Sequence, residues 1–126
     1  MSFIYVREIP MPGEILADMP LDKDLEKIKA GKDQEIKEVF TKKSGKFILI
    51  IGPCSAHDED AVCDYISRLA KVQELVKDKI VIIPRIYTNK PRTTGSGYKG
   101  MAHQPDPQEA PNMVKGIKAI RRMHIR

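Results

Sequence analysis

The hydrophobic and polar positions of the chain divide it into an irregular amino-terminal stretch followed by alternating helix-like and strand-like segments. Residues 1–20 contain three prolines and a glycine, which predict an extended arm with one short turn at residues 13–18. In residues 21–43, apolar side chains recur at helical spacing among charged ones, which predicts an amphipathic helix. Gly31 is a candidate break that would divide this helix in two.

Two short apolar runs have the pattern of buried strands. The runs from Phe47 to Ile51 and from Ile80 to Tyr87 are rich in β-branched residues, as in parallel strands covered on both faces. Residues 62–76 between them repeat apolar side chains at helical spacing, and Ser55 to Asp58 has the composition of a helix N-cap. Strand, helix and strand within about forty residues predict a βαβ unit.

A second helix is expected after a long loop. The helical spacing of four residues predicts it: Met113, Ile117, Ile120 and His124. The fold class is therefore α/β, with a helical extension before a βαβα sequence. Because two strands do not make an independently stable sheet, residues 46–126 are expected to form the first part of a larger structure.

Composition narrows the class of protein. Of the 126 residues, 41% are hydrophobic and 31% are charged, which is ordinary for one globular domain. The longest apolar run is far shorter than a membrane span, and no secretory signal pattern begins the chain. We therefore expect a cytoplasmic protein with no membrane partner. Cys54 and Cys63 lack C-x-x-C spacing and are expected to be free thiols.

The distribution of charge favours a small anionic ligand. The net charge is +5, and basic and acidic residues are interleaved before Phe47. From Arg85 to Lys99 there are four cations and no acid. Aromatic residues make up only 6% and do not alternate with the cations, which argues against a nucleic-acid partner. The excess charge follows a strand, where α/β folds bind their ligands.

Residues 90–100, KPRTTGSGYKG, have the chemistry of a phosphate-binding loop. A guanidinium offers a planar fork of donors, ammonium groups add point charges, and hydroxyls add further donors. Pro91 restricts the backbone and lowers the entropy cost of ordering the loop. A solvated basic loop is the alternative. The glycines have the G-x-G-x-x-G spacing of dinucleotide-binding folds. In those folds the glycines begin a helix, whereas prolines follow them here, so we do not expect a dinucleotide site. The side chains with this chemistry are Lys90, Arg92, Thr93, Thr94 and Lys99.

Two residues directly after the strands are candidates for chemistry. Cys54 is a potential nucleophile or metal ligand, and an inert buried thiol is the alternative. His57 lies three residues later, so a C-x-x-H metal pair and a solvent-facing histidine are both open. Arg85 leaves the core at a strand end, where a guanidinium needs either an ion-pair partner or an anionic ligand.

Three motifs taken together resemble the class I 3-deoxy-D-arabino-heptulosonate 7-phosphate (DAHP) synthases. They are IGPCSAHD (residues 51–58), PRIYTNKPRTT (84–94) and GYKG (97–100). The resemblance covers residues 46–126, and residues 1–45 look like the amino-terminal extension of that family. It implies a (β/α)8 TIM barrel, of which residues 46–126 would form the first two βα units, so that this chain would hold an incomplete barrel.

The resemblance also implies an activity and a set of site residues. The family condenses phosphoenolpyruvate with erythrose 4-phosphate, the first step of the shikimate pathway to aromatic amino acids, and uses a divalent metal such as Mn, Fe or Co. Its members form homo-oligomers. The implied roles are metal ligand for Cys54, phosphoenolpyruvate binding for Arg85, catalysis between the two substrates for Lys90, and further substrate binding for Pro91, Arg92, Thr93 and Lys99.

Two alternatives remain open. The family's other metal ligands come from later strands, so we expect the 126 residues alone to be inactive, and the chain is alternatively an assembly or regulatory fragment that docks on a full-length synthase. The related 3-deoxy-manno-octulosonate 8-phosphate synthases also use phosphoenolpyruvate. The KPRTT motif favours the heptulosonate enzymes over these relatives.

Overall fold

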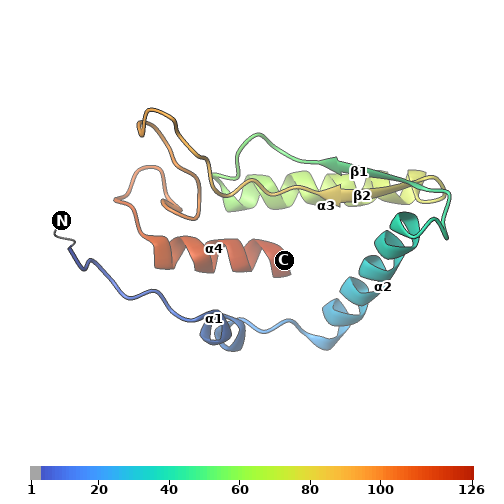
Figure 1. Ribbon diagram of the computed structural model, residues 1–126, viewed down its shortest axis with the longest axis horizontal. Helices are drawn as coiled ribbons and strands as arrows, with labels where there is room; N and C mark the ends of the chain where they lie inside the picture. Colours follow the sequence, from blue (N-terminus) through green and yellow to red (C-terminus); the bar gives the residue numbers. More distant parts are fainter. Residues whose placement is uncertain (1–3) are drawn as a thin grey trace.

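The fold is α/β, as predicted, and the described residues form two parallel strands and four helices (Figure 1). A computed structural model describes residues 4–126, so residues 1–3 of the predicted arm lie outside the described part. Among the helices of residues 4–126, none combines the length and the apolar character needed to cross a bilayer. The elements are α1 (Pro12–Asp18), α2 (Lys23–Phe40), β1 (Phe47–Ile51), α3 (Glu59–Val76), β2 (Ile80–Pro84) and α4 (Met113–Ile125).

The predicted βαβ unit is confirmed. β1 and β2 pair in parallel with Phe47 opposite Ile80, and α3 runs along the sheet between them in sequence (Figure 1). Asp58 begins α3 as its N-cap, because its carboxylate accepts a hydrogen bond from the Ala61 amide at 2.7 Å. The Gln73 side chain then accepts from the Ile82 amide at 2.6 Å, which fastens α3 to β2.

The prediction that β1 is buried on both faces is wrong for this structure. Phe47 is 75% exposed and Ile50 is 63% exposed. The sheet has two strands and α3 packs against it, which covers only part of the apolar surface that an interior strand presents. The sequence pattern of β1 is that of a strand with neighbours on all sides, and its surroundings here are more open.

α4 forms as predicted, and its buried residues are not the four whose spacing indicated the helix. Gly116, Ala119 and Met123 are buried, and His124 is exposed. A Cβ atom at Gly116 would lie 2.4 Å from the carbonyl oxygens of Met101 and Ala102, so the missing side chain lets the preceding loop approach the helix. Small residues contribute little to a hydrophobic pattern, so the pattern does not mark this buried face. The core cluster is Ala56, Val62, Met101, Ala119 and Met123.

The amino-terminal extension lies beside α4, although about a hundred residues of sequence separate them (Figure 1). Lys118 pairs with Asp18 at 2.7 Å, and Arg121 Nε donates to the Met19 carbonyl at 3.0 Å. The predicted turn at residues 13–18 is a seven-residue helix, α1. The helix at 23–40 is continuous through Gly31, so the proposed break there is wrong.

An ion pair between α2 and the residue before β1 leads to a testable pH dependence. Lys46 Nζ lies 2.7 Å from Glu35 Oε1, and this hydrogen bond, with a second from Lys32, lowers the pKa of the Glu35 carboxyl. A lowered folded-state pKa stabilises the protein above the unfolded-state pKa, and this stability is lost as pH falls through the folded pKa.

We therefore expect Glu35→Gln to lower the free energy of unfolding by about 0.5 kcal/mol at pH 7 and by nearly nothing at about pH 3. Urea unfolding at both pH values measures the difference. Glu8→Gln, at an exposed position of the arm, is the control and should match the unsubstituted protein at both. An equal loss for Glu35→Gln at both pH values would contradict the prediction.

Candidate functional site

The two strands end at the same edge of the sheet, and the backbone joins the segments that follow them. The Arg85 amide donates to the Ile51 carbonyl at 2.8 Å, and the Ala56 amide donates to the Tyr87 carbonyl at 2.9 Å. Gly52 lies so close to β2 that a Cβ atom there would be 1.8 Å from the Arg85 carbonyl oxygen. The loop after β1 is therefore held directly against the segment after β2.

Three of the predicted site residues meet at this edge: Cys54, Arg85 and Lys90, here called the strand-end cluster. Lys90 Nζ donates a hydrogen bond to Cys54 Sγ at 3.4 Å, and Arg85 Nη2 donates to the Pro53 carbonyl at 3.0 Å. The Cys54 side chain is exposed rather than buried, so the inert-thiol alternative does not describe it. Cys63 is also a free thiol, as predicted, and packs against the core.

A second group of cations surrounds a neighbouring cavity of about 330 Å³. This basic cavity is lined by Lys90, Arg92 and Lys99, together with uncharged residues and His103. Lys90 belongs both to the basic cavity and to the strand-end cluster, so it joins the two.

Hydrogen bonds within residues 90–100, here called the basic loop, join its two ends. The Lys90 amide donates to the Lys99 carbonyl at 2.8 Å, and Arg92 Nε donates to the Tyr98 carbonyl at 3.0 Å. Gly100 has φ of 104°, and a Cβ atom there would lie 2.4 Å from the Thr88 carbonyl oxygen, so only glycine suits this position. These hydrogen bonds and the glycine restrict the conformation of the loop that carries Lys90, Arg92 and Lys99.

The predicted threonine pair lies on a turn at the tip of the loop. The Gly95 amide donates to the Arg92 carbonyl at 3.1 Å, with exposed Thr93 between them. The Thr94 hydroxyl lies 2.9 Å from that of Ser96. Pro91 lines the basic cavity, whereas Thr93 is not among the residues that line it. The structure therefore gathers Pro91, Arg92 and Lys99 around Lys90 and leaves Thr93 outside the cavity.

The positive charge of this region is not neutralised by the protein. Within the part of the chain that the structure describes, no carboxylate forms an ion pair with any of the four cations of the loop region. Such a cluster attracts anions, and a guanidinium beside ammonium groups suits phosphate and carboxylate oxygens. The four cations are Arg85, Lys90, Arg92 and Lys99.

Sequence reasoning missed residues that the structure adds to the site. The Tyr87 ring lies under the Arg85 guanidinium, with 4.8 Å from Cζ to the ring centroid. Side chains two residues apart share a face of an extended segment, so the R-x-Y spacing is a signal that would have found Tyr87. His103 lines the basic cavity and has no comparable signal in the sequence.

The Tyr98 side chain of the basic loop is partly buried. Burial raises the pKa of its phenol, and its hydroxyl has no hydrogen-bond partner among the described residues.

The side chains present fit one metal ligand rather than a complete metal site. Cys54 offers an exposed sulfur, while His57 is exposed and its Nδ1 lies 3.4 Å from the Ser55 carbonyl oxygen. Across residues 4–126, no group of three His, Cys, Asp or Glu side chains is placed so that it could hold a metal ion. Metal centres in proteins take three or four protein ligands, so Cys54 alone would not complete one.

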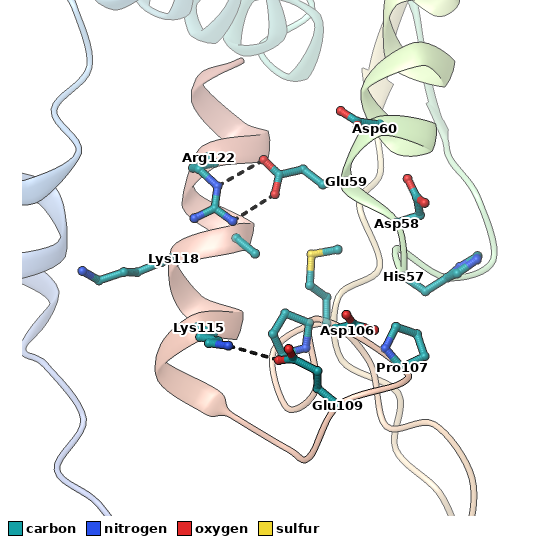
Figure 2. Close-up of a pocket in the computed structure, with 13 residues that line it drawn as sticks. His57, Asp58, Glu59, Asp60, Asp106, Pro107, Glu109, Lys115, Lys118 and Arg122 are labelled. Atoms are coloured by element: carbon teal, nitrogen blue, oxygen red, sulfur yellow. Dashed lines mark hydrogen bonds and ion pairs between the residues drawn. The ribbon is translucent and has the colours of Figure 1, made fainter.

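A more spacious cavity, of about 650 Å³, lies apart from the strand-end cluster, between α4 and the start of α3 (Figure 2). Its cations are paired with carboxylates: Arg122 Nη2 lies 3.1 Å from Glu59 and Lys115 lies 3.0 Å from Glu109, while Lys118 pairs with Asp18. These pairs join α4 to α3, to its own preceding loop and to α1. Because the cations of this cavity are already paired, the unpaired cations of the strand-end region are the stronger candidate site for an anion.

Comparison with known proteins assigns the chain to a family. The sequence pattern of the DAHP synthetase I family matches residues 23–120, which include both strands, α3 and the whole basic loop. The chain belongs to the DAHP synthetase I family. This assignment confirms the resemblance that the motifs after the two strands indicated.

Relatives within the DAHP synthetase I family are similar over most of this chain. A phospho-2-dehydro-3-deoxyheptonate aldolase of Corynebacterium glutamicum is 32% identical over 119 residues, covering 94% of this chain and 32% of the relative. The phenylalanine-inhibited enzyme of that name from Saccharomyces cerevisiae is 39% identical over 89 residues, covering 71% of this chain and 24% of the relative. The chain thus spans about a third or less of the length of these relatives.

A solved structure of the same family has the same arrangement of elements. The phospho-2-dehydro-3-deoxyheptonate aldolase of Francisella tularensis superposes with a TM-score of 0.88 at 27% sequence identity, covering 97% of this chain and 36% of that one. The match extends over the amino-terminal extension as well as the βαβα part.

Proposed function

We propose that this chain contributes part of the active site of a 3-deoxy-7-phosphoheptulonate synthase, which joins phosphoenolpyruvate to erythrose 4-phosphate. One observation carries the proposal. Lys90 contacts the sulfur of Cys54 on one side and lines a cavity with Arg92 and Lys99 on the other. An ammonium group between a potential metal ligand and an anion-binding cavity suits a reaction between two phosphorylated substrates.

The reaction forms one carbon–carbon bond and releases phosphate. C3 of phosphoenolpyruvate attacks the aldehyde carbon of erythrose 4-phosphate, and the aldehyde oxygen takes up a proton. Water adds at C2 of phosphoenolpyruvate, and the C–O bond to phosphate then breaks, so that phosphate leaves with the bonding electron pair and C2 becomes a ketone. Negative charge therefore develops and moves between the two substrates, where a fixed cation is most effective.

The residues of this chain would divide the binding of the two substrates. Arg85 would bind phosphoenolpyruvate, whose carboxylate and phosphate both match a guanidinium fork. Lys90 would stabilise the charge that develops between the substrates. Arg92 and Lys99 would hold the phosphate of erythrose 4-phosphate in the basic cavity, whose wall includes Pro91. Thr93 would bind the same substrate from the exposed loop tip outside the cavity.

Cys54 would supply one ligand to a divalent metal. When bound, such a metal acts as a Lewis acid that polarises a carbonyl oxygen. The exposed sulfur beside Lys90 fits a ligand that is bound as thiolate. Further ligands would come from residues outside the 126 of this chain, in a homo-oligomeric synthase of the family's kind.

We further propose that residues 46–126 are the first two βα units of a (β/α)8 barrel and that residues 1–45 form an extension outside it. Supporting this, β1 and β2 are parallel neighbours in sequence order, and the site lies beyond their carboxyl ends. The apolar side chains that β1 exposes, including Phe47 and Ile50, suit a strand with further neighbours.

The chain alone is expected to show no synthase turnover, because a single sulfur ligand does not hold a divalent metal for catalysis. Phosphate release is measured with both substrates and Mn²⁺, and the chain should not exceed its own Cys54→Ala variant. Turnover well above that variant would contradict the prediction.

A chimera tests the proposed function directly. The chain replaces the matched segment of the Corynebacterium glutamicum relative, which it resembles at 32% identity. We expect the chimera to form the seven-carbon product from erythrose 4-phosphate and the Cys54→Ala chimera to be inactive. Arabinose 5-phosphate as the alternative acceptor tests the octulosonate alternative. A folded chimera, by circular dichroism, that uses neither acceptor would reject the proposal.

A further inference from the structure

The Arg85 guanidinium contacts an aromatic ring. It lies over Tyr87, with Cζ 4.8 Å from the ring centroid. Arg85 itself is exposed, and in the part of the chain that the structure describes it pairs with no carboxylate. Tyr87 is half-buried, so the ring is the more constrained partner of the two.

The core holds Tyr87 in place through the backbone. The Tyr87 carbonyl accepts a hydrogen bond from the amide of Ala56 at 2.9 Å, and Ala56 is completely buried. The neighbouring Ile86 packs against the same core cluster. Tyr87 is therefore fixed by both the loop after β1 and the core, and its ring gives the flexible Arg85 side chain a fixed surface.

A hydrogen bond to the backbone also restricts the orientation of the Arg85 guanidinium. Arg85 Nη2 donates to the Pro53 carbonyl at 3.0 Å, next to Cys54. Ring and carbonyl together restrict a long side chain that would otherwise lose much rotamer entropy when it bound a ligand. A guanidinium has five N–H donors, and the Pro53 carbonyl engages one nitrogen, so donors remain for an anion.

We propose that Tyr87 is a positioning residue that holds the Arg85 guanidinium in the orientation in which it binds a carboxylate or phosphate anion. It acts through Arg85 and not on the ligand. The inference rests on the proposed function, which names phosphoenolpyruvate as that anion. Stacking on the ring needs no hydroxyl, so the aromatic face of Tyr87 and not its phenol group is the feature that matters.

The test compares Tyr87→Phe, which keeps the ring, with Tyr87→Leu, which removes it. Tyr5→Leu is the matched control, because Tyr5 is 73% exposed on the arm. The Arg85 Nε–Hε resonance of the 126-residue protein is followed by NMR while phosphoenolpyruvate is added. Inorganic phosphate is a second probe. If Tyr87→Leu does not fold by circular dichroism, Tyr87→Met takes its place.

We expect an upfield ring-current shift of the Arg85 resonance in the unsubstituted protein and in Tyr87→Phe, and its loss in Tyr87→Leu. Removing the ring should weaken binding of the anion about fivefold, whereas Tyr87→Phe and Tyr5→Leu should stay within about twofold. A purely structural role for Tyr87 would not give rescue by phenylalanine together with the ring-current shift.

The inference is overturned if the unsubstituted protein has no ring-current shift, if Tyr87→Leu binds the anion as well as Tyr87→Phe does, or if neither probe perturbs Arg85. The proposed function fails in a different way. In that case inorganic phosphate perturbs Arg85 and phosphoenolpyruvate does not, and the comparison of the Tyr87 variants, made with phosphate, still decides the role of the ring.

Discussion

Gly52→Ala is expected to lower the free energy of unfolding by about 3 kcal/mol or more, a large share of the stability of a small domain. The new methyl carbon would lie 1.8 Å from the Arg85 carbonyl oxygen, 2.8 Å from the carbonyl carbon and 3.1 Å from Cα. All three atoms are backbone, so no side chain can rotate away. Relief requires the two strand ends to separate, which breaks the hydrogen bond between the Arg85 amide and the Ile51 carbonyl.

Gly45→Ala is the matched control for Gly52. No atom lies within 4 Å of a Cβ at Gly45, which precedes β1, so alanine there should change the free energy of unfolding by at most about 0.5 kcal/mol. Urea unfolding followed by circular dichroism measures both variants. A Gly52→Ala protein as stable as Gly45→Ala would mean that the segments after β1 and β2 are not in direct contact.

Lys90→Met is expected to lower kcat of the chimeric synthase by about 10²–10³-fold, the usual cost of removing one charge-stabilising donor from an active site. Methionine keeps most of the length and volume of the side chain and removes the ammonium. Lys90 contacts Cys54 Sγ at 3.4 Å and lines the basic cavity, so the lost charge would have faced both substrates. Steady-state kinetics with each substrate varied in turn measures the loss.

Two further variants separate charge from geometry at Lys90. Lys90→Arg keeps the charge and changes its shape, so we expect it to recover only part of the activity. Lys71→Met removes an exposed lysine from α3 and should leave kcat unchanged. A Lys90→Met chimera with the activity of Lys71→Met would show that Lys90 has no part in the chemistry.

Much of the candidate site was predictable because parallel strands bring their carboxyl ends to one edge. Cys54 and Arg85 follow the two strands within a few residues, and the loop with Lys90 comes next along the chain. Their proximity follows from the βαβ pattern alone. The position of Tyr87 beside Arg85 could also have been predicted, because the two residues are two apart in an extended segment. The position of His103 could not, because it depends on how a long loop folds.

The pattern of apolar and polar residues determined the order of elements from residue 21 onward and the parallel pairing of β1 and β2, and the motifs after the two strands indicated the family. Periodicity and motif spacing are local properties of the chain. Tertiary structure decided which face of α4 is buried, how closely Gly52 approaches β2, and that Thr93 lies outside the basic cavity. These features depend on contacts between segments far apart in sequence. Small residues such as Gly116 and Gly52 act there through the side chain that they lack, and a hydrophobic pattern does not record an absent side chain.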